Sequence, residues 1–207
     1  LLEVKNLKTY FFTPFGKVKA VDDISFTMKK GASLGLAGES GCGKTTTAYS
    51  LINLVPLPGR IIGGEINFKG EDILQYNDKQ TKDLRWKEIS MVFQGAMASL
   101  NPLFKIGNQI AEPIIYHEQI DKNDAMDRAR ELLELVGIEQ SRVDNYPWEL
   151  SGGMRQRAMI AMALACYPTL LIADEPTTAL DVIVSAQVMD LIKDLRKKLD
   201  LSMLLIT

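Results

Sequence analysis

Cysteine is scarce in this chain, which holds only Cys42 and Cys166. Two isolated cysteines are too few for a disulfide framework or for a cysteine metal site. The sequence therefore predicts reduced thiols, as in a cytosolic protein. Cys42 lies in a glycine-rich segment before a predicted helix, where a helix end can activate a thiol, but we expect a spectator role for it.

A long uninterrupted apolar run is also missing. The longest apolar stretch, Met159–Ala173, is interrupted by Pro168 and is too short to cross a bilayer. It is typical of a buried helix followed by a buried strand. The first residues, Leu1–Lys5, carry charge almost at once and do not resemble a secretory signal. We therefore expect any membrane role to come through a partner protein.

Neither sign of charge dominates. The 24 basic and 26 acidic residues give a formal net charge of −2, so the charge balance does not favour nucleic acid or an anionic membrane as a primary ligand. The short basic cluster Arg196–Lys198 lies beside acidic residues and indicates a solvated helix face. Core-forming residues are abundant: 46% of the 207 residues are hydrophobic, enough for one large domain or one domain carrying a lobe.

The most informative segment present is Gly38–Thr45, which fits the pattern G-x-x-x-x-G-K-[ST] of phosphate-binding loops. Ser33–Ala37 precedes it as a predicted buried parallel strand, and Thr46–Ile52 follows as a predicted helix. Glycines let backbone N–H groups approach phosphate oxygens, and the helix N-terminus adds a positive dipole end. In such a loop Lys44 reaches the β- and γ-phosphates, and Thr45 places its hydroxyl on Mg²⁺. The alternative is a glycine-rich turn before an ordinary helix. The predicted nucleotide-binding residues of the loop are Gly38, Glu39, Ser40, Gly41, Cys42, Gly43, Lys44, Thr45 and Thr46.

Carboxylates follow another predicted buried strand, Leu170–Asp174. An acid at the end of a parallel strand beside a phosphate loop is where Mg²⁺ needs an oxygen ligand, and Asp174 fits that role. Glu175 is then free to orient or deprotonate an attacking water. Gln94 ends the predicted strand Ile89–Phe93 and is a candidate contact to the metal or the water, although taken alone it is typical of a surface glutamine. The predicted catalytic residues are Glu175, Gln94 and Lys44, and the predicted metal ligands are Thr45, Gln94 and Asp174.

Two further segments have the composition of helix starts. Ser151, Gly152 and Gly153 would form a second anion-binding helix end, which is more than the phosphates of one nucleotide require. A flexible N-cap is the alternative for this segment. Asp181 is a further candidate for the nucleotide site, and it could equally be a helix N-cap.

The overall pattern predicts an α/β fold with a P-loop triphosphatase core and a mainly parallel sheet. Strands at Leu2–Leu7 and Val18–Met28 indicate an antiparallel β layer on the N-terminal side, and Gly63-Gly64 is predicted to turn into a short strand, Glu65–Phe68. After Gln94 a turn-rich segment, Ala96–Pro102, leads into helical patterns. The predicted helices are Ile106–Ile115, Asn123–Val136 and Ser151–Ala165. We therefore expect a core of residues 1–94 and 166–207 with an inserted helical subdomain of residues 95–165.

In order and spacing, these motifs resemble those of the ATP-binding cassette (ABC) ATPases over essentially the whole chain. The matching segments are Gly38–Thr45, Gln94, Leu150–Met154, Leu171–Glu175 and Ala179–Asp181. The resemblance implies a head-to-tail dimer that sandwiches two ATP molecules, in which Ser151, Gly152 and Gly153 of one subunit close on the γ-phosphate held by the other. It also implies that Phe15 stacks on adenine. Tyr10 is a second candidate for this stacking, and a hydrophobic loop contact is the alternative for both.

A finer resemblance is to the ATPases of dipeptide and oligopeptide importers, although related nickel and sugar importers share much of the same sequence in these segments. The segments that carry it are Phe93–Pro102, Ile110–Ile114, Leu150–Arg157 and Asp174–Val182. The resemblance implies an ATP- and Mg²⁺-dependent subunit that powers import of peptides or similar small solutes. It implies a second ATPase subunit and transmembrane permease subunits as partners, an extracytoplasmic solute-binding protein as an indirect one, and a place on the cytoplasmic face of the membrane.

Three departures from the family pattern stand out. Met154 replaces the glutamine that commonly ends the signature, as it often does in peptide-importer relatives, and Gly95 stands where an aspartate is frequent, which would soften the loop after Gln94. Family members place a switch histidine after the strand that ends here as Leu204–Thr207; His117, the only histidine, is a poor substitute and is predicted to lie on the surface. Peptide-importer relatives also carry a C-terminal iron–sulfur extension. We therefore expect this chain to be a fragment of a longer one.

Two alternative functions follow from the same residues. One is a soluble ABC ATPase that acts on nucleic acid or ribosomes; such proteins usually carry two cassettes or basic insertions, and neither occurs here. The other is a nucleotide-gated dimerisation module without efficient hydrolysis, which the absence of a switch histidine would favour.

Overall fold

The computed structural model describes residues 1–95 and 99–207, which form two β-sheets and a group of helices. The antiparallel sheet has the strand order β2 (Gly16–Met28), β1 (Leu2–Thr13), β4 (Gly59–Phe68), β5 (Glu71–Asp72). The parallel sheet has the order β3 (Ser33–Leu36), β8 (Ser202–Ile206), β7 (Leu170–Asp174), β6 (Ile89–Val92). The α-helices are α1 (Lys44–Leu51), α2 (Asp78–Lys87), α3 (Ile106–Glu118), α4 (Lys122–Leu135), α5 (Gly152–Ala163) and α6 (Val182–Lys198). The expected α/β class with a parallel sheet and an antiparallel β layer is confirmed.

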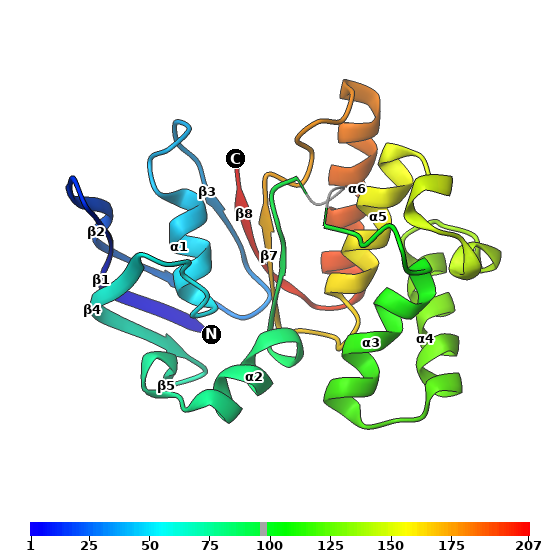
Figure 1. Cartoon of the computed structure of the whole chain (residues 1–207), viewed down its shortest axis with the longest axis horizontal. Helices are drawn as coiled ribbons and strands as arrows, with labels where there is room; N and C mark the ends of the chain where they lie inside the picture. Colours follow the sequence, from blue (N-terminus) through cyan, green and yellow to red (C-terminus); the bar gives the residue numbers. More distant parts are fainter. Residues whose placement is uncertain (96–98) are drawn as a thin grey trace.

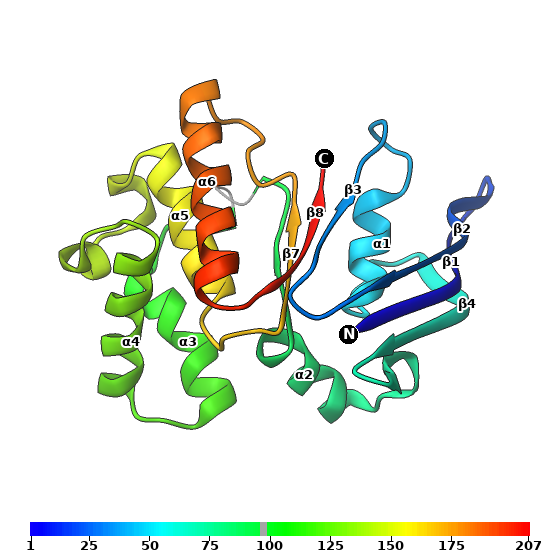
Figure 2. The same cartoon turned by 180° about the vertical axis from the view of Figure 1, so that it is seen from behind.

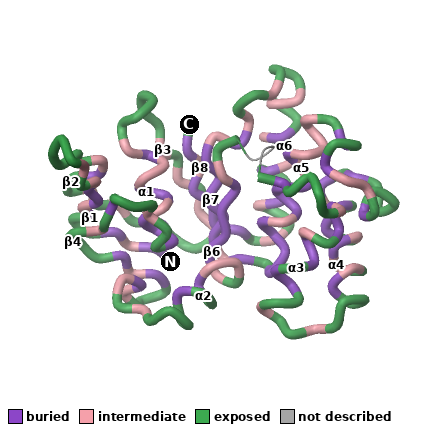
Figure 3. The backbone as a smooth tube through the Cα atoms, in the orientation of Figure 1, coloured by how far each residue is buried: buried purple, intermediate pink, exposed green. Residues whose placement is uncertain are grey.

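The elements are arranged in layers. α1 lies between the two sheets, and α3 to α6 lie on the far side of the parallel sheet (Figures 1 and 2). Each face of the parallel sheet is therefore covered by its own hydrophobic cluster. In β7, Leu170 and Ile172 belong to the cluster shared with α1 and the antiparallel sheet, whereas Leu171 belongs to the helical cluster. This two-sided burial explains why β6, β7 and β8 are almost continuously apolar and buried (Figure 3).

β3 differs from the prediction of a buried strand. It pairs in parallel with β8 and lies at one edge of the parallel sheet, with Ser33 and Gly35 exposed. An edge strand has a neighbouring strand on one side only, so β3 stays partly exposed although its sequence is apolar. The parallel direction was predicted correctly, and it delivers the chain to the phosphate-loop segment at the carboxyl end of the sheet.

The predicted turn at Gly63-Gly64 is wrong, because both glycines lie inside the continuous strand β4. The pairing of β1 with β4 shifts register between Lys5 and Lys8, which is a β-bulge. Gly64 has a φ of +96°, and a Cβ there would meet the Leu7 backbone nitrogen at 2.7 Å. Glycine is therefore required by close approach of two strands and not by a chain reversal.

The three predicted helices are confirmed as α3, α4 and α5, while α2 was missed. α2 begins with a capping box in which Asn77 and Gln80 bond each other's backbone N–H. It buries only Thr81 and Leu84, so it lacks the apolar periodicity that predicts helices. Residues 96–98 of the predicted turn-rich segment lie outside the described residues. Within residues 1–95 and 99–207, no helix is both long and apolar enough to span a bilayer.

Candidate nucleotide-binding site

The glycines of the Gly38–Thr45 loop are required by its geometry. Gly41 and Gly43 have φ values of +80° and +100°, in the region that favours glycine. A Cβ on Gly43 would lie 2.0 Å from the carbonyl oxygen of Ala20, which β2 brings against the loop. α1 then begins at Lys44, so the loop ends at the positive end of this helix.

Lys44 lies inside the loop, with its side chain almost fully buried. Its Nζ donates to the carbonyl oxygens of Gly38 at 2.6 Å and Glu39 at 2.8 Å. These contacts fix the ammonium group against the loop backbone. A cation held in this way, beside N–H groups at a helix start, makes the loop an anion-binding site.

A cavity of about 140 Å³ opens at the loop. It brings together eight of the predicted site residues, including Gln94 and Glu175 from distant parts of the sequence. Its lining residues are Ala20, Ser40, Gly41, Gly43, Lys44, Thr45, Thr46, Gln94 and Glu175. Ala20 was not predicted, and no sequence pattern marks it, because its place depends on the packing of β2 against the loop.

The side chains of Gln94 and Glu175 form a hydrogen bond. The Gln94 Nε2 donates to Glu175 Oε2 at 2.7 Å, and the Thr178 hydroxyl donates to the same oxygen at 2.9 Å. Gln94 follows β6 and Glu175 follows β7, and these two strands are neighbours in the parallel sheet. Thr178 was missed as a partner because a threonine three residues downstream carries no distinctive signal. The arrangement orients one carboxylate at the mouth of the cavity.

Asp174 is fully buried at the end of β7, and among the described residues neither of its carboxylate oxygens has a hydrogen-bond partner. Burial raises the pKa of this carboxyl above its ordinary value, against the opposing influence of Thr45 and Lys44. A buried carboxylate without a partner is costly unless a cation neutralises it. The donor set of Asp174 with the nearby Thr45 hydroxyl consists of hard oxygens, which fits Mg²⁺.

The residues Ser151, Gly152 and Gly153 do not line this cavity. Ser151 caps α5 by accepting from the Met154 N–H at 3.3 Å, as the N-cap alternative predicted. Asp181 likewise caps α6, accepting from the Val184 N–H at 2.9 Å. A Cβ on Gly153 would meet Val184 Cγ1 at 2.7 Å, so the starts of α5 and α6 lie against each other. The adjoining starts of α5 and α6 are therefore separate from the start of α1, which lies at the loop cavity.

The two aromatic candidates for base stacking differ. Phe15 lies fully exposed in the turn between β1 and β2. Tyr10 is 4% exposed, its hydroxyl donates to the Asp22 carboxylate, and Lys17 lies over its ring at 5.0 Å from the centroid. The ring of Tyr10 is therefore already covered, and Tyr10 is not a suitable stacking residue.

Comparison with known proteins agrees with this geometry. Residues 21–178 match the ABC transporter family. The chain belongs to this family. It is 51% identical over 210 residues to the "Oligopeptide transport ATP-binding protein OppD" of Bacillus subtilis (strain 168), covering 100% of the chain and 59% of that relative. It is 47% identical to the "Dipeptide transport ATP-binding protein DppD" of Lactococcus lactis subsp. cremoris (strain MG1363), again over the whole chain and 60% of the relative.

A solved structure resembles the cassette over its full length. It is described as the dimeric structure of a post-hydrolysis state of the ATP-binding cassette MJ0796 bound to ADP and Pi. The TM-score is 0.85 at 26% sequence identity, covering 100% of this chain and 88% of the other. The chain spans about 60% of the length of the curated relatives it matches.

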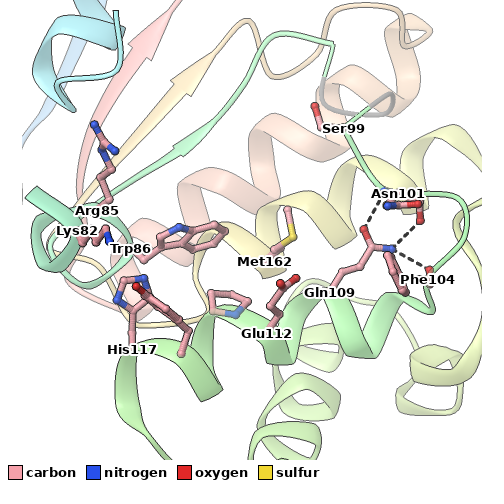
Figure 4. A pocket seen from close by; sticks show the side chains of 12 residues that line it. Lys82, Arg85, Trp86, Ser99, Asn101, Phe104, Gln109, Glu112, His117 and Met162 are labelled. Carbon is pink, nitrogen blue, oxygen red and sulfur yellow. Dashed lines mark hydrogen bonds between the residues drawn. The ribbon is translucent and has the colours of Figure 1, made fainter. Parts of the chain in front are cut away.

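The cassette has a second and larger cavity, of about 690 Å³, between α2, α3 and α5 (Figure 4). Trp86 of α2 and Met162 of α5 face it, with Gln109 and Glu112 of α3 on the opposite side. His117 also lines this cavity and is half-buried, so it lies at the surface only in part. Burial lowers the pKa of His117, and its ring meets Tyr116 edge-on at 4.9 Å.

The two cysteines of the cassette have different surroundings. Cys42 is exposed in the phosphate loop, and its Sγ lies 3.9 Å from Lys44 Nζ. Cys166 is buried, and its Sγ donates to the Pro113 carbonyl at 3.6 Å. Burial raises the pKa of the Cys166 thiol to about 11, so this thiol is unreactive at neutral pH.

Proposed function

We propose that this cassette binds ATP with Mg²⁺ and hydrolyses it as the ATPase subunit of a membrane importer for dipeptides, oligopeptides or similar small solutes. The observation that carries the proposal is the convergence of Lys44, Gln94 and Glu175 on one cavity beside the buried Asp174. The names of the OppD and DppD relatives support peptides as the solute class.

In this proposal the loop N–H groups and Lys44 hold the β- and γ-phosphates, and Phe15 stacks on adenine. Thr45, Gln94 and Asp174 would hold Mg²⁺, which when bound neutralises charge that develops on the phosphate oxygens. Lys44 adds a second positive charge on the same oxygens. The chemistry is therefore mainly positioning and electrostatic stabilisation.

Glu175 is the residue proposed to act on water. Its Oε2 accepts bonds from Gln94 and Thr178, which fix the carboxylate while the other oxygen remains available to a water molecule. The water, oriented and deprotonated by Glu175, attacks the γ-phosphorus in line with the bond to the β-phosphate oxygen. ADP and inorganic phosphate are the products.

A second ATPase subunit, identical or related, completes the proposed site. Ser151, Gly152 and Gly153 form a helix start that this chain does not direct into its own loop cavity. The dimeric MJ0796 cassette supports a dimer. In the head-to-tail arrangement that we propose, this segment, with Asp181 beside it, meets the γ-phosphate held by the partner. ATP would then close the dimer, and hydrolysis would reopen it.

We also propose that residues 95–165 act as a helical subdomain that transmits closure to transmembrane permease subunits, with residues 1–94 and 166–207 as the nucleotide-binding core. The cassette would then sit peripherally at the cytoplasmic face of the membrane. A solute-binding protein outside the membrane would be an indirect partner. Nucleic acid is not a proposed ligand.

The test is ATP binding, phosphate release and labelled-dipeptide uptake, measured on the full-length protein with its membrane partners and on the Lys44→Ala variant. We expect ATP-dependent uptake that Lys44→Ala abolishes together with ATP binding. Unchanged ATP affinity in Lys44→Ala would contradict the loop assignment. ATP-driven dimerisation without phosphate release would favour the dimerisation module, and co-purification with nucleic acid would favour the soluble alternative.

A further inference from the structure

The last turn of α2 departs from helical geometry at two residues. Arg85 has φ −68° and ψ 137°, and Trp86 has φ +74° and ψ −52°. A positive φ is disfavoured for a bulky residue and persists when surrounding contacts enforce it. The contacts made by these two side chains run in different directions, and together they span from the helix that carries the phosphate loop to the large cavity.

Arg85 contacts the chain just beyond α1. Its Nε donates to the Ile52 carbonyl oxygen at 2.8 Å, and its Nη2 donates to the Asn53 carbonyl oxygen. These carbonyls lie at the negative end of α1, where a cation is stabilising. The guanidinium is a rigid fork, so its two bonds fix both distance and orientation. The far end of the phosphate-loop helix is therefore held by one residue of α2.

Trp86 contacts the helical side of the molecule. Both Arg85 and Trp86 line the 690 Å³ cavity, but only Trp86 packs against the helical hydrophobic cluster, and the guanidinium of Arg85 points away from the Trp86 ring (Figure 4). Because Arg85 and Trp86 are consecutive, a displacement of one moves the backbone of the other. α1 has eight residues and is about 12 Å long at 1.5 Å per residue, short enough to move as a rigid rod.

We propose that Arg85 is a positioning residue that couples the phosphate loop to the cavity between α2, α3 and α5, with Trp86 as the group that moves in the cavity. Nucleotide binding at the start of α1 shifts the carbonyls of Ile52 and Asn53, Arg85 follows them, and Trp86 changes its surroundings. Because coupling between two sites is reciprocal, occupancy of the cavity changes ATP affinity by the same factor. The inference rests on the proposed function in requiring that ATP binds.

The test uses the fluorescence of Trp86. The chain has two tryptophans, so Trp148→Phe in the full-length protein leaves Trp86 as the reporter within this cassette, and tryptophans elsewhere in a longer chain are replaced likewise. ATP–Mg²⁺ is titrated, and its affinity is measured independently by calorimetry. We expect the Trp86 emission to change with the same dissociation constant. Arg85→Ala should remove most of this change and weaken ATP binding by about fivefold, the lower end of typical couplings.

Lys82→Ala is the matched control, because Lys82 lines the same cavity but, unlike Arg85, forms no hydrogen bond to the chain after α1. It should leave the emission change intact. Arg85→Lys keeps the charge without the fork and should give an intermediate change; it also serves as the decisive variant if Arg85→Ala does not fold. A full-sized emission change in the Arg85 variants, or ATP binding without any change in the parent, would overturn the coupling alone. Absence of ATP binding by calorimetry would overturn the proposed function and the coupling with it.

Discussion

Gln94 and Glu175, 81 residues apart in the sequence, share a hydrogen bond of 2.7 Å at the carboxyl ends of two adjacent parallel strands. The bond leaves the Glu175 carboxylate with a fixed orientation at the phosphate-loop cavity. It also makes the two residues act as a unit, so their contributions to turnover should not be independent.

We predict that Glu175→Gln keeps ATP affinity and lowers turnover by roughly 10²-fold or more, the scale of a positioned general base. The amide preserves the shape of the side chain but does not accept the proton. Phosphate release and ATP affinity measured side by side check this. Glu131→Gln removes an exposed carboxylate of α4 and should leave both values unchanged. Near-normal turnover in Glu175→Gln would remove this residue from the proposed role.

Gln94→Ala should lower turnover by about tenfold, because a hydrogen bond to a charged group contributes about 1.5 kcal/mol. The effect is smaller than that of Glu175→Gln because Thr178 still holds the carboxylate. At saturating Mg²⁺, which offsets the loss of the proposed Gln94 contact to the cation, the double variant should be no slower than Glu175→Gln alone, and single-turnover rates of all four proteins test this. Additive losses would mean that Gln94 acts separately from Glu175.

Asp174→Asn should raise the melting temperature measured without Mg²⁺ at neutral pH. Burial raises the pKa of Asp174 above 3.8, so the folded state favours the protonated form and this group's contribution to stability falls as the pH rises through the folded pKa. Removing the charge should add about 1 kcal/mol, or about 2–4 °C for a chain of this size. The gain should vanish well below pH 3.8, where the carboxyl is neutral in both states. A gain that persists there would point to packing instead of charge.

The same variant should lose the stabilisation that Mg²⁺ and ATP give together to the parent protein. Thermal melts with and without EDTA measure the difference. An equal rise of the melting temperature in parent and Asp174→Asn would exclude this carboxylate as the cation site.

Gly43→Ala should abolish ATP binding and destabilise the fold by about 1–3 kcal/mol, the cost of forcing a side chain into the left-handed region, with the clash against Ala20 added to it. Gly35→Ala is the control, because a Cβ at Gly35 meets no atom within 4 Å. Chemical denaturation and ATP titration of both variants test the prediction. ATP binding by Gly43→Ala at the parent's affinity would contradict the observed loop geometry.

Sequence alone predicted those parts of the site in which the local geometry or chemistry accepts only one type of residue. Gly41 and Gly43 were predictable because the loop needs positive φ, and Asp174 because an acid ends an otherwise apolar strand. Ala20 and Thr178 were not, since their roles come from tertiary packing and from a local turn. The same limit applied to Gly64, where sequence alone does not separate a bulge from a turn.

Burial was the least predictable property of the fold. The apolar segment of β3 has the composition of a central strand, yet it lies at the sheet edge, because strand order is decided by the connections between strands and not by the strand itself. α2 was missed because its sequence is mostly polar and lacks a periodic apolar face. This helix is stabilised instead by its capping box and by two buried side chains.

The contact between Gly153 and Val184 has a mechanical consequence. The starts of α5 and α6 are close-packed there, so the caps Ser151 and Asp181 lie on adjoining helix starts. In the proposed division of the chain, α5 belongs to the helical subdomain and α6 to the core, so this contact lies on the boundary between them. Any rotation of the subdomain against the core must therefore separate Gly153 from Val184 or slide one past the other.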